Sequence, residues 1–247
     1  MTVEIRANSL GVRFMFDRQR RVVTPALARL HRRGTATWGL HDLTFSIEPG
    51  EGIALIGASG SGKTTLLRTL AGVFEPDVGT LRVNGRVASL LSIDAGLLSI
   101  LTGRENVMLL GVLMGLPRRH VRAVMDEIRT ESKLDDSFDR PVSSYSQGMR
   151  ARLSLAVASQ IQPQILLLDE VHEALDHEFR MVLESRARMI LQSGGIVVAA
   201  GHDHEMLSRL CERGLWLERA RLRAEGRIEE IRTAYLEGMG SDQQRAV

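Results

Sequence analysis

Apolar residues recur along this chain with two different periods, and the order of the two periods predicts an α/β fold. Short apolar runs within residues 52–56, 165–170 and 195–200 are typical of parallel strands that are buried on both faces. Elsewhere apolar residues recur every three or four positions, which is the spacing of a helix with one buried face. The two patterns follow one another along most of the chain, as expected for βαβ units around a mostly parallel sheet.

The same patterns give approximate bounds for each expected element. Strands are predicted at residues 3–12, 43–47, 52–56, 80–83, 86–91, 165–170, 195–200, 214–218 and 221–224. Helices are predicted at about 62–72, 105–113, 118–133, 146–160, 177–192, 204–213 and 227–236. Turn and cap signals predict four further details: a hairpin at Asn84-Gly85, a helix cap at Thr102, a polar connector over 135–142 and a frayed tail over 238–247.

Strand patterns are missing between about residues 94 and 160, where helical spacing dominates. We therefore expect an α-helical subdomain to be inserted into the α/β core at this place. The first strands and the last pair of strands alternate polar and apolar residues, which predicts antiparallel β elements beside the parallel core. No internal repeat or low-complexity segment interrupts this order.

A glycine-rich loop follows the apolar strand at 52–56 and precedes a helix, which is the context of a phosphate-binding P-loop. Its backbone N–H groups would surround phosphate oxygens, and the helix end adds a positive dipole. Lys63 would place a positive charge on the β- and γ-phosphates, and the Thr64 hydroxyl would bind Mg²⁺. The expected nucleotide-binding residues of the loop are Gly57, Ala58, Ser59, Gly60, Ser61, Gly62, Lys63, Thr64 and Thr65.

Two acidic residues, Asp169 and Glu170, follow the apolar run that begins at residue 165. The carboxyl ends of parallel strands form the edge at which α/β sheets bind ligands, so both side chains are expected beside the P-loop. Asp169 is placed to hold Mg²⁺ through water. Glu170 is placed to act as general base toward an attacking water molecule.

A second predicted helix, at 146–160, begins with Ser146 and Gly148, so its N-terminus could also bind a phosphate. One P-loop already serves one nucleotide, and this second helix end therefore needs its own ligand. A dimer in which Ser146 and Gly148 contact the ATP of the other subunit would supply that ligand.

Composition narrows the class of protein. The 247 residues carry a formal net charge of +2, a balance that requires no nucleic-acid partner. Lys63 and Lys133 are the only lysines, and the single cysteine, Cys211, excludes a disulfide framework and suits a reducing compartment. No signal-peptide core is visible, and the longest apolar stretch, 107–116, is too short to cross a bilayer. We expect a soluble chain, or one that a partner holds at a membrane.

In this order the motifs resemble those of the ATP-binding-cassette (ABC) ATPases, over nearly the whole chain. Residues 57–65 are similar to Walker A, 165–170 to Walker B, 146–149 to the signature loop and 174–176 to the D-loop. The resemblance implies a single nucleotide-binding domain over 1–247, with a P-loop (RecA-like) core and a helical subdomain at about 94–160. It further implies that His202 contacts the γ-phosphate and that Asp176 lies at the nucleotide.

Two features depart from the family pattern, and a third position, the adenine-stacking residue, has several candidates. Gln147 and Met149 replace the usual residues of the signature loop. No glutamine lies between residues 87 and 103, where the family's Q-loop glutamine is expected, and Ser92 or Asp94 would have to replace it. The aromatic residue that stacks on adenine is expected to be Phe14, with Phe16 and Trp38 as alternatives.

Four segments resemble the ATPases of polysaccharide, O-antigen and teichoic-acid exporters: 92–96, 101–106, 145–153 and 169–171. The resemblance implies an ATPase, dependent on ATP and Mg²⁺, that drives export of a lipid-linked cell-surface glycan. It implies a homodimer on a dimer of membrane permease subunits, at the cytoplasmic face of the plasma membrane, with no nucleic-acid partner. Some members add a C-terminal carbohydrate-binding domain, for which this chain is expected to be too short.

Other functions remain open from the sequence: export of another lipid or a peptide, a soluble ABC ATPase acting on nucleic acid or ribosomes, and a P-loop kinase outside the family. Two segments bear on the membrane partner. The arginine-rich stretch at 17–33 is either a solvated loop or a surface that faces anionic lipid. The apolar stretch at 92–116 either docks the membrane subunit or packs as ordinary core.

Overall fold

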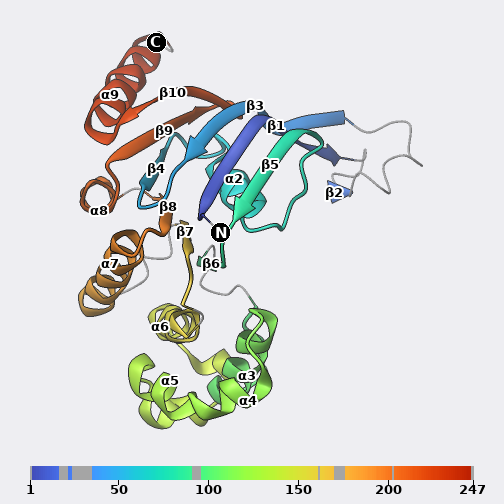
Figure 1. Ribbon diagram of the computed structural model, residues 1–247, viewed down its shortest axis with the longest axis vertical. Coiled ribbons are helices and arrows are strands. Elements are labelled where there is room, and N and C mark those ends of the chain that lie inside the picture. Colours follow the sequence, from blue (N-terminus) through green and yellow to red (C-terminus); the bar gives the residue numbers. More distant parts are fainter. Residues whose placement is uncertain are drawn as a thin grey trace.

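The computed structural model describes residues 2–16, 22–23, 35–90, 96–160, 162–169, 176–201 and 203–245. Figure 1 shows two sheets that enclose helix α2 (Lys63–Leu70), and a lobe of helices below them. Of the predicted arginine-rich stretch at 17–33, only β2 (Val22–Val23) lies within the described residues. In the part of the chain that the structure describes, no helix is both long and apolar enough to cross a membrane.

The first sheet is antiparallel and is built around β1 (Glu4–Phe16). Strand β3 (Thr35–Ile47) pairs with β1 along one side. On its other side, β1 pairs with β5 (Val78–Asn84) near its start and with β2 at its end. The predicted strands at 3–12 and 43–47 are therefore longer than the pattern alone indicated.

The second sheet has the order β10-β9-β4-β8-β7-β6 and is parallel except at one edge. Strand β10 (Arg221–Arg227) pairs antiparallel with β9 (Arg213–Glu218), which confirms the predicted closing hairpin. The other strands of this sheet are β4 (Gly52–Ile56), β6 (Val87–Leu90), β7 (Ile165–Asp169) and β8 (Ile196–Ala200).

Alternate residues of the central strands face two different hydrophobic clusters. On β4, Ile53 and Leu55 belong to the cluster around α2, whereas Ala54 and Ile56 belong to the cluster on the opposite face. The opposite face is covered by α6 (Gln147–Ser159), α7 (His177–Gln192), α8 (His204–Leu210) and α9 (Ile228–Arg245). Burial on both faces explains why these strands are continuously apolar in the sequence.

A third hydrophobic cluster holds the helical lobe together. It is formed by side chains of α3 (Gly103–Leu113), α4 (Arg118–Ala123), α5 (Met125–Ser132) and α6, with two 3-10 helices, η1 (Asp135–Asp139) and η2 (Val142–Ser144). Helix α6 contributes Leu153 to this cluster and Leu155 to the core under the sheet. The lobe therefore has its own core and shares α6 with the rest of the molecule (Figure 1).

The predicted hairpin at Asn84-Gly85 is wrong. Strand β5 pairs with β1 in the first sheet, whereas β6 pairs with β7 in the second. The Asn84 amide donates a hydrogen bond to Glu4 on β1 (3.0 Å), and Ala88 and Leu90 of β6 are buried under α6. Each strand therefore finds its partner in a different sheet, and the turn signal marks a crossing between the two sheets.

Four further boundaries differ from those predicted. The helix at 118–133 is divided at Val124, where φ is −98° and ψ is 8°, and this bend directs Val121 and Ile128 into the same cluster. The connector at 135–142 holds the two 3-10 helices, and Phe138 in the first is fully buried. The helix predicted at 204–213 ends at Leu210, because Arg213 already belongs to β9. The last helix continues to Arg245, beyond the predicted fraying point.

Candidate functional site

The P-loop connects β4 to α2 at the carboxyl edge of the parallel sheet. Gly57 has φ of 152° and Gly62 has φ of 115°, conformations that L-residues with a side chain rarely adopt. A β-carbon at Gly57 would overlap the carbonyl oxygen of Leu217, and one at Gly62 would lie 2.9 Å from that of Gly39. Both glycines are therefore needed for the loop to fit against β9 and β3.

Lys63 is the first residue of α2 and is only 7% exposed. Its Nζ donates hydrogen bonds to the carbonyl oxygens of Gly57 (2.6 Å) and Ala58 (3.1 Å), so the ammonium group closes the loop on itself. The Ser61 hydroxyl is buried and accepts or donates no hydrogen bond among the described residues. An orphaned hydroxyl beside a buried ammonium group and the N-terminus of an eight-residue helix suits a phosphate group.

Asp169 ends β7 and is 7% exposed. In the register of the sheet, Ala200 of β8 pairs with both Asp169 of β7 and Leu55 of β4. Asp169 therefore lies two strands from β4, the strand that enters the P-loop, with β8 between them and roughly 10 Å across the sheet. Asp169 and the P-loop therefore lie at the same edge of the sheet, as predicted.

The two described aromatic candidates for adenine stacking lie on opposite faces of the antiparallel sheet, since consecutive cross-strand pairs, Phe14–Thr37 and Arg13–Trp38, point in opposite directions. The Phe14 ring packs edge-on against Phe74 (5.3 Å between centroids). A β-carbon at Gly39 would overlap the Phe14 ring and lie 3.1 Å from the Thr65 methyl group, so Phe14 is on the P-loop side.

Trp38 instead contacts His41 (4.5 Å between centroids) and the Arg13 guanidinium (5.2 Å from the ring centre). This arrangement favours Phe14 over Trp38 as the adenine-facing side chain. The side chain of Phe16 lies outside the described residues.

Ser146 is the N-cap of α6, and its hydroxyl accepts a hydrogen bond from the Met149 N–H (3.2 Å). Ser146 is exposed, and Gly148 lies in the first helical turn, where backbone N–H groups have no acceptor within the helix. In Figure 1 the lobe that contains α6 lies apart from α2 and the P-loop. The predicted helix N-terminus at Ser146 is thus present, in a lobe apart from the P-loop, and its role in phosphate binding stays a prediction.

Asp176 is the N-cap of α7 and accepts a hydrogen bond from the Phe179 N–H (3.0 Å). Its carboxylate also lies 3.9 Å from the guanidinium of Arg152 on α6, and that guanidinium stacks over the Phe179 ring (5.2 Å). Helices α6 and α7, whose N-caps are Ser146 and Asp176, therefore contact each other. The sequence analysis missed Arg152, because nothing in the local pattern indicates a contact across two helices.

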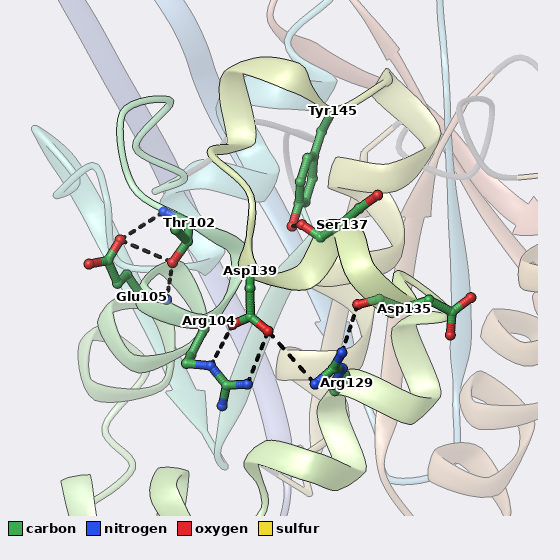
Figure 2. Close-up of polar contacts among 8 residues, drawn as sticks. All are labelled: Thr102, Arg104, Glu105, Arg129, Asp135, Ser137, Asp139 and Tyr145. Carbon is green, nitrogen blue, oxygen red and sulfur yellow. Dashed lines mark hydrogen bonds and ion pairs between the residues drawn. The ribbon is translucent and has the colours of Figure 1, made fainter.

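The segment that leads into Ser146 is hydrogen-bonded to the loop that precedes α3. Val142 N–H donates to the Leu101 carbonyl (2.9 Å), Ser143 N–H to that of Ser99 (2.8 Å), and Gly103 N–H to that of Arg140 (3.2 Å). Figure 2 shows the side chains that reinforce this pairing: Arg104 and Arg129 both contact the Asp139 carboxylate, and the Tyr145 hydroxyl donates to the Ser137 carbonyl (2.6 Å).

The first turn of α3 fixes the same loop. Thr102 and Glu105 form a reciprocal capping box, which confirms the predicted cap. Asn106 is fully buried, and its side-chain amide accepts from the Leu98 N–H (2.8 Å) and donates to the carbonyls of Leu98, Leu101 and Thr102. The loop at 98–102 and the residues before Ser146 therefore form one rigid unit.

The apolar stretch at 92–116 is only partly core. Val107 and Leu110 are buried in the cluster of the lobe, as one helical stripe requires. Four large apolar side chains remain exposed: Leu98 (48%), Ile100 (82%), Val112 (42%) and Leu113 (67%). These four exposed side chains agree with the prediction that part of the stretch docks a membrane subunit, whereas the buried residues are ordinary core.

Several predicted site residues lie outside the described residues. These are Glu170, His202, Ser92, Asp94 and the D-loop residues 174–175. Their proposed roles continue to depend on the sequence alone.

Comparisons with known proteins show the family to which the chain is related. Residues 40–173 match the family model described as ABC transporter. The chain is 37% identical over 207 residues to the O-antigen export system ATP-binding protein RfbB of Klebsiella pneumoniae, with 84% of each chain covered. It is 33% identical over 198 residues to the teichoic acids export ATP-binding protein TagH of Lactiplantibacillus plantarum, covering 80% of this chain and 54% of that relative.

A solved dimeric ATP-binding cassette, in a post-hydrolysis state with ADP and Pi, matches the fold with a TM-score of 0.72 at 19% identity. The match covers 91% of this chain and 98% of the solved chain. It confirms the predicted α/β P-loop fold.

The Asp139 carboxylate gives a pH-dependent test of the unit that leads into Ser146. The hydrogen bond from Arg104 holds the pKa of Asp139 below its usual value. A carboxyl group whose pKa is lower in the folded state stabilises the fold above its unfolded pKa, near 4, and this stabilisation is lost as the pH falls through the folded value. We therefore expect Asp139→Asn to lower the urea midpoint of unfolding at pH 7, with the difference from the parent shrinking as the pH falls below about 4, toward the folded pKa of Asp139.

Asp136→Asn is the matched control, because Asp136 is an exposed carboxylate in the same 3-10 helix with no ion pair among the described residues. It should change the midpoint little at either pH. A difference for Asp139→Asn that stays constant between pH 7 and pH 3 would contradict the proposed role of the ion pair.

Proposed function

We propose that this chain, which belongs to the ABC transporter family, is the ATP-hydrolysing subunit of an exporter for a lipid-linked cell-surface polysaccharide. The observation that carries the proposal is the alignment with an O-antigen export ATP-binding protein over 84% of both chains. A relative named for teichoic acid export points to the same substrate class, a glycan carried on a lipid. O-antigen, capsule, teichoic acid and galactan all belong to this class.

ATP binds an ABC ATPase through its P-loop, and here the loop would be residues 57–65 of a single nucleotide-binding unit that spans 1–247. Lys63 would hold the β- and γ-phosphates, and the orphaned Ser61 hydroxyl would gain a phosphate oxygen as its partner. Phe14 would cover the adenine, since its ring lies next to Thr65 and Gly39. The helical lobe at about 94–160 would be the inserted subdomain.

Mg²⁺ would be held by the Thr64 hydroxyl and, through water, by the Asp169 carboxylate. Both are oxygen donors, which Mg²⁺ prefers, and its remaining ligands would be phosphate oxygens and water. When bound, the ion neutralises charge on the transferred phosphoryl group. The buried position of Asp169 beside the strand that enters the P-loop supports this assignment.

Hydrolysis would proceed by in-line attack of water on the γ-phosphorus. Glu170 would take a proton from that water as its oxygen bonds to phosphorus, and the bond to the bridging oxygen of ADP would break. Lys63 and His202 would stabilise the charge that develops on the γ-phosphoryl oxygens.

Two copies of the chain would form the complete site. Ser146, Gly148 and Asp176 lie at helix N-termini, and α6 belongs to a lobe apart from the P-loop (Figure 1). An antiparallel pair of subunits would bring these helix ends to the ATP of the partner copy. ATP would then hold the dimer closed, and hydrolysis would shift the population toward the open form.

The composite site predicts different effects on binding and on dimerisation. Glu170→Gln should lower the steady-state ATPase rate about 100-fold or more and yield a dimer with ATP in size-exclusion chromatography. Ser146→Arg in that background should abolish the dimer but leave the ATP affinity of the monomer within about twofold, because the residue serves the other subunit's nucleotide.

Ser143→Arg is the control. Ser143 is an exposed serine three residues earlier, and among the described residues it forms a hydrogen bond through its backbone N–H and none through its side chain. It should leave the ATP-dependent dimer intact. Collapse of monomer affinity in the Ser146→Arg variant would refute the composite site.

The proposed substrate predicts a cellular phenotype. Loss of the chain should remove one lipid-linked glycan from the cell surface and cause that glycan to accumulate on the cytoplasmic side. The parent chain should restore export, and Glu170→Gln should not, because transport requires hydrolysis. A normal surface glycan profile together with retention of a different lipid or a peptide would refute glycan export while leaving the ATPase assignment intact.

A pair of permease subunits in the plasma membrane would be the partner, which would hold this chain at the cytoplasmic face. The exposed apolar side chains at Leu98 and Ile100 support a contact there, because Asn106 fixes the loop that carries them. On a protein surface, exposed apolar side chains of this kind favour a protein interface.

Single cysteines can test this contact. Cysteine at Leu98 should crosslink to a cytoplasmic loop of the co-purified permease, with a yield that changes when ATP is added. Cysteine at Leu109 on α3 should crosslink less, because this position is half-buried. No crosslink from Leu98→Cys in an intact complex would leave this loop outside the interface.

A further inference from the structure

The turn between β9 and β10 adopts a backbone conformation that its sequence does not favour. Arg219 has φ of 49° and Ala220 has φ of 64°, so two consecutive residues with β-carbons occupy the left-handed region. Two-residue hairpin turns of this kind normally use Asn-Gly or Asp-Gly. Strained residues of this type persist where the surrounding structure holds them, and they concentrate at functional sites.

The surroundings of Ala220 are the P-loop and β3. Ala220 N–H donates to the Ser61 carbonyl oxygen (3.0 Å), and the Ala220 carbonyl accepts from the His41 N–H (2.6 Å). Ala220 is 6% exposed, so both hydrogen bonds are protected from water. The turn thus links the P-loop to the antiparallel sheet through one peptide unit on each side of Ala220.

The bond to Ser61 fixes the orientation of the peptide group between Ser61 and Gly62. In a planar trans peptide the C=O and the following N–H point in opposite directions. Because the Ser61 carbonyl points toward Ala220, the Gly62 N–H points to the other side of the loop. Gly62 is the N-cap of α2, so this N–H belongs to the helix end that would face a phosphate.

The loop has little room to adopt another position. A β-carbon at Gly62 would lie 2.9 Å from the Gly39 carbonyl oxygen and 3.6 Å from the Ala220 Cα. At the start of the loop, Gly57 lies against the carbonyl of Leu217, two residues before the turn. Strand β9 and its turn therefore form the wall behind the P-loop.

We propose that Ala220 is a positioning residue for phosphate binding, whose backbone N–H holds the Ser61–Gly62 peptide so that the loop amides face the phosphates. The inference rests on the proposed nucleotide site at residues 57–65 and adds a contact from outside the P-loop. Ala220 acts through its backbone, so the identity of its side chain matters only through the φ that it permits.

Ala220→Val tests the proposal, because β-branched residues tolerate the left-handed region poorly and should move the turn. We expect the dissociation constants of fluorescent ATP and ADP analogues to rise about tenfold, as for the loss of roughly one hydrogen bond. The dissociation constants for ATP and ADP should rise by the same factor, since the loop amides would contact phosphates that both nucleotides carry. If Ala220→Val folds poorly, Arg219→Val should give the same result, because Arg219 is an exposed position in the same turn whose φ is also positive.

Lys133→Val is the matched control, because Lys133 also has positive φ (50°) but caps α5 in the helical lobe. It should lower the melting temperature comparably and leave nucleotide affinity at the parental value. Ala220→Gly should retain parental affinity, because glycine adopts the same φ and keeps both backbone hydrogen bonds.

Parental affinity in a folded Ala220→Val or Arg219→Val variant would overturn the inference, as would equal weakening in Ala220→Gly or in Lys133→Val. Lys63→Ala separates this failure from failure of the proposed site. If Lys63→Ala abolishes binding while Ala220→Val does not weaken it, only the positioning role is refuted. If Lys63→Ala binds ATP as the parent does, the P-loop is not the nucleotide site and both proposals fail.

Discussion

The burial of the parallel sheet on both faces is the constraint on which the rest of the structure depends. Each central strand sends alternate apolar side chains into two different clusters, one around α2 and one under α6 to α9. A strand in this position cannot face water on either side, so helices must cover both faces. The only polar groups that such strands can display are at their ends. This is why the P-loop and Asp169 meet at one edge of the sheet.

The helical lobe has a core of its own, and among the described residues α6 is the helix of the lobe that also packs under the sheet. The polar contacts around Asp139 and the buried Asn106 make the segment before Ser146 and the loop before α3 move together. A rigid unit with a helix N-terminus at one place and exposed Leu98 and Ile100 at another can respond to a nucleotide and to a protein partner at once. In the proposed dimer, this unit would carry the effect of ATP from one subunit to the permease.

The sequence predicted those features that depend on neighbouring residues. The P-loop strand, Thr102 as a cap and the β9–β10 hairpin each have a local signal, and the structure contains all three. The Asn84-Gly85 hairpin failed because strand pairing depends on distant partners, here Glu4 on β1 for one strand and β7 for the other. The contact of Ala220 with Ser61 joins residues 159 positions apart and carries no signal in either segment.

The surroundings of each basic residue explain why arginine is used at some positions and lysine at others. Apart from Lys63 and Lys133 the basic residues that carry a permanent charge are arginines, and several described arginines pair with carboxylates, as Arg213 does with Glu51 (2.9 Å) and Arg186 with Glu131 (3.0 Å). A planar guanidinium suits such two-oxygen partners. Lys133 is exposed and pairs with the Glu178 carboxylate. Lys63 differs, because its ammonium group is enclosed by the P-loop and donates to the backbone carbonyl oxygens of Gly57 and Ala58. A compact point charge suits that enclosure, and it also suits a phosphate group that lies between the charge and the helix end.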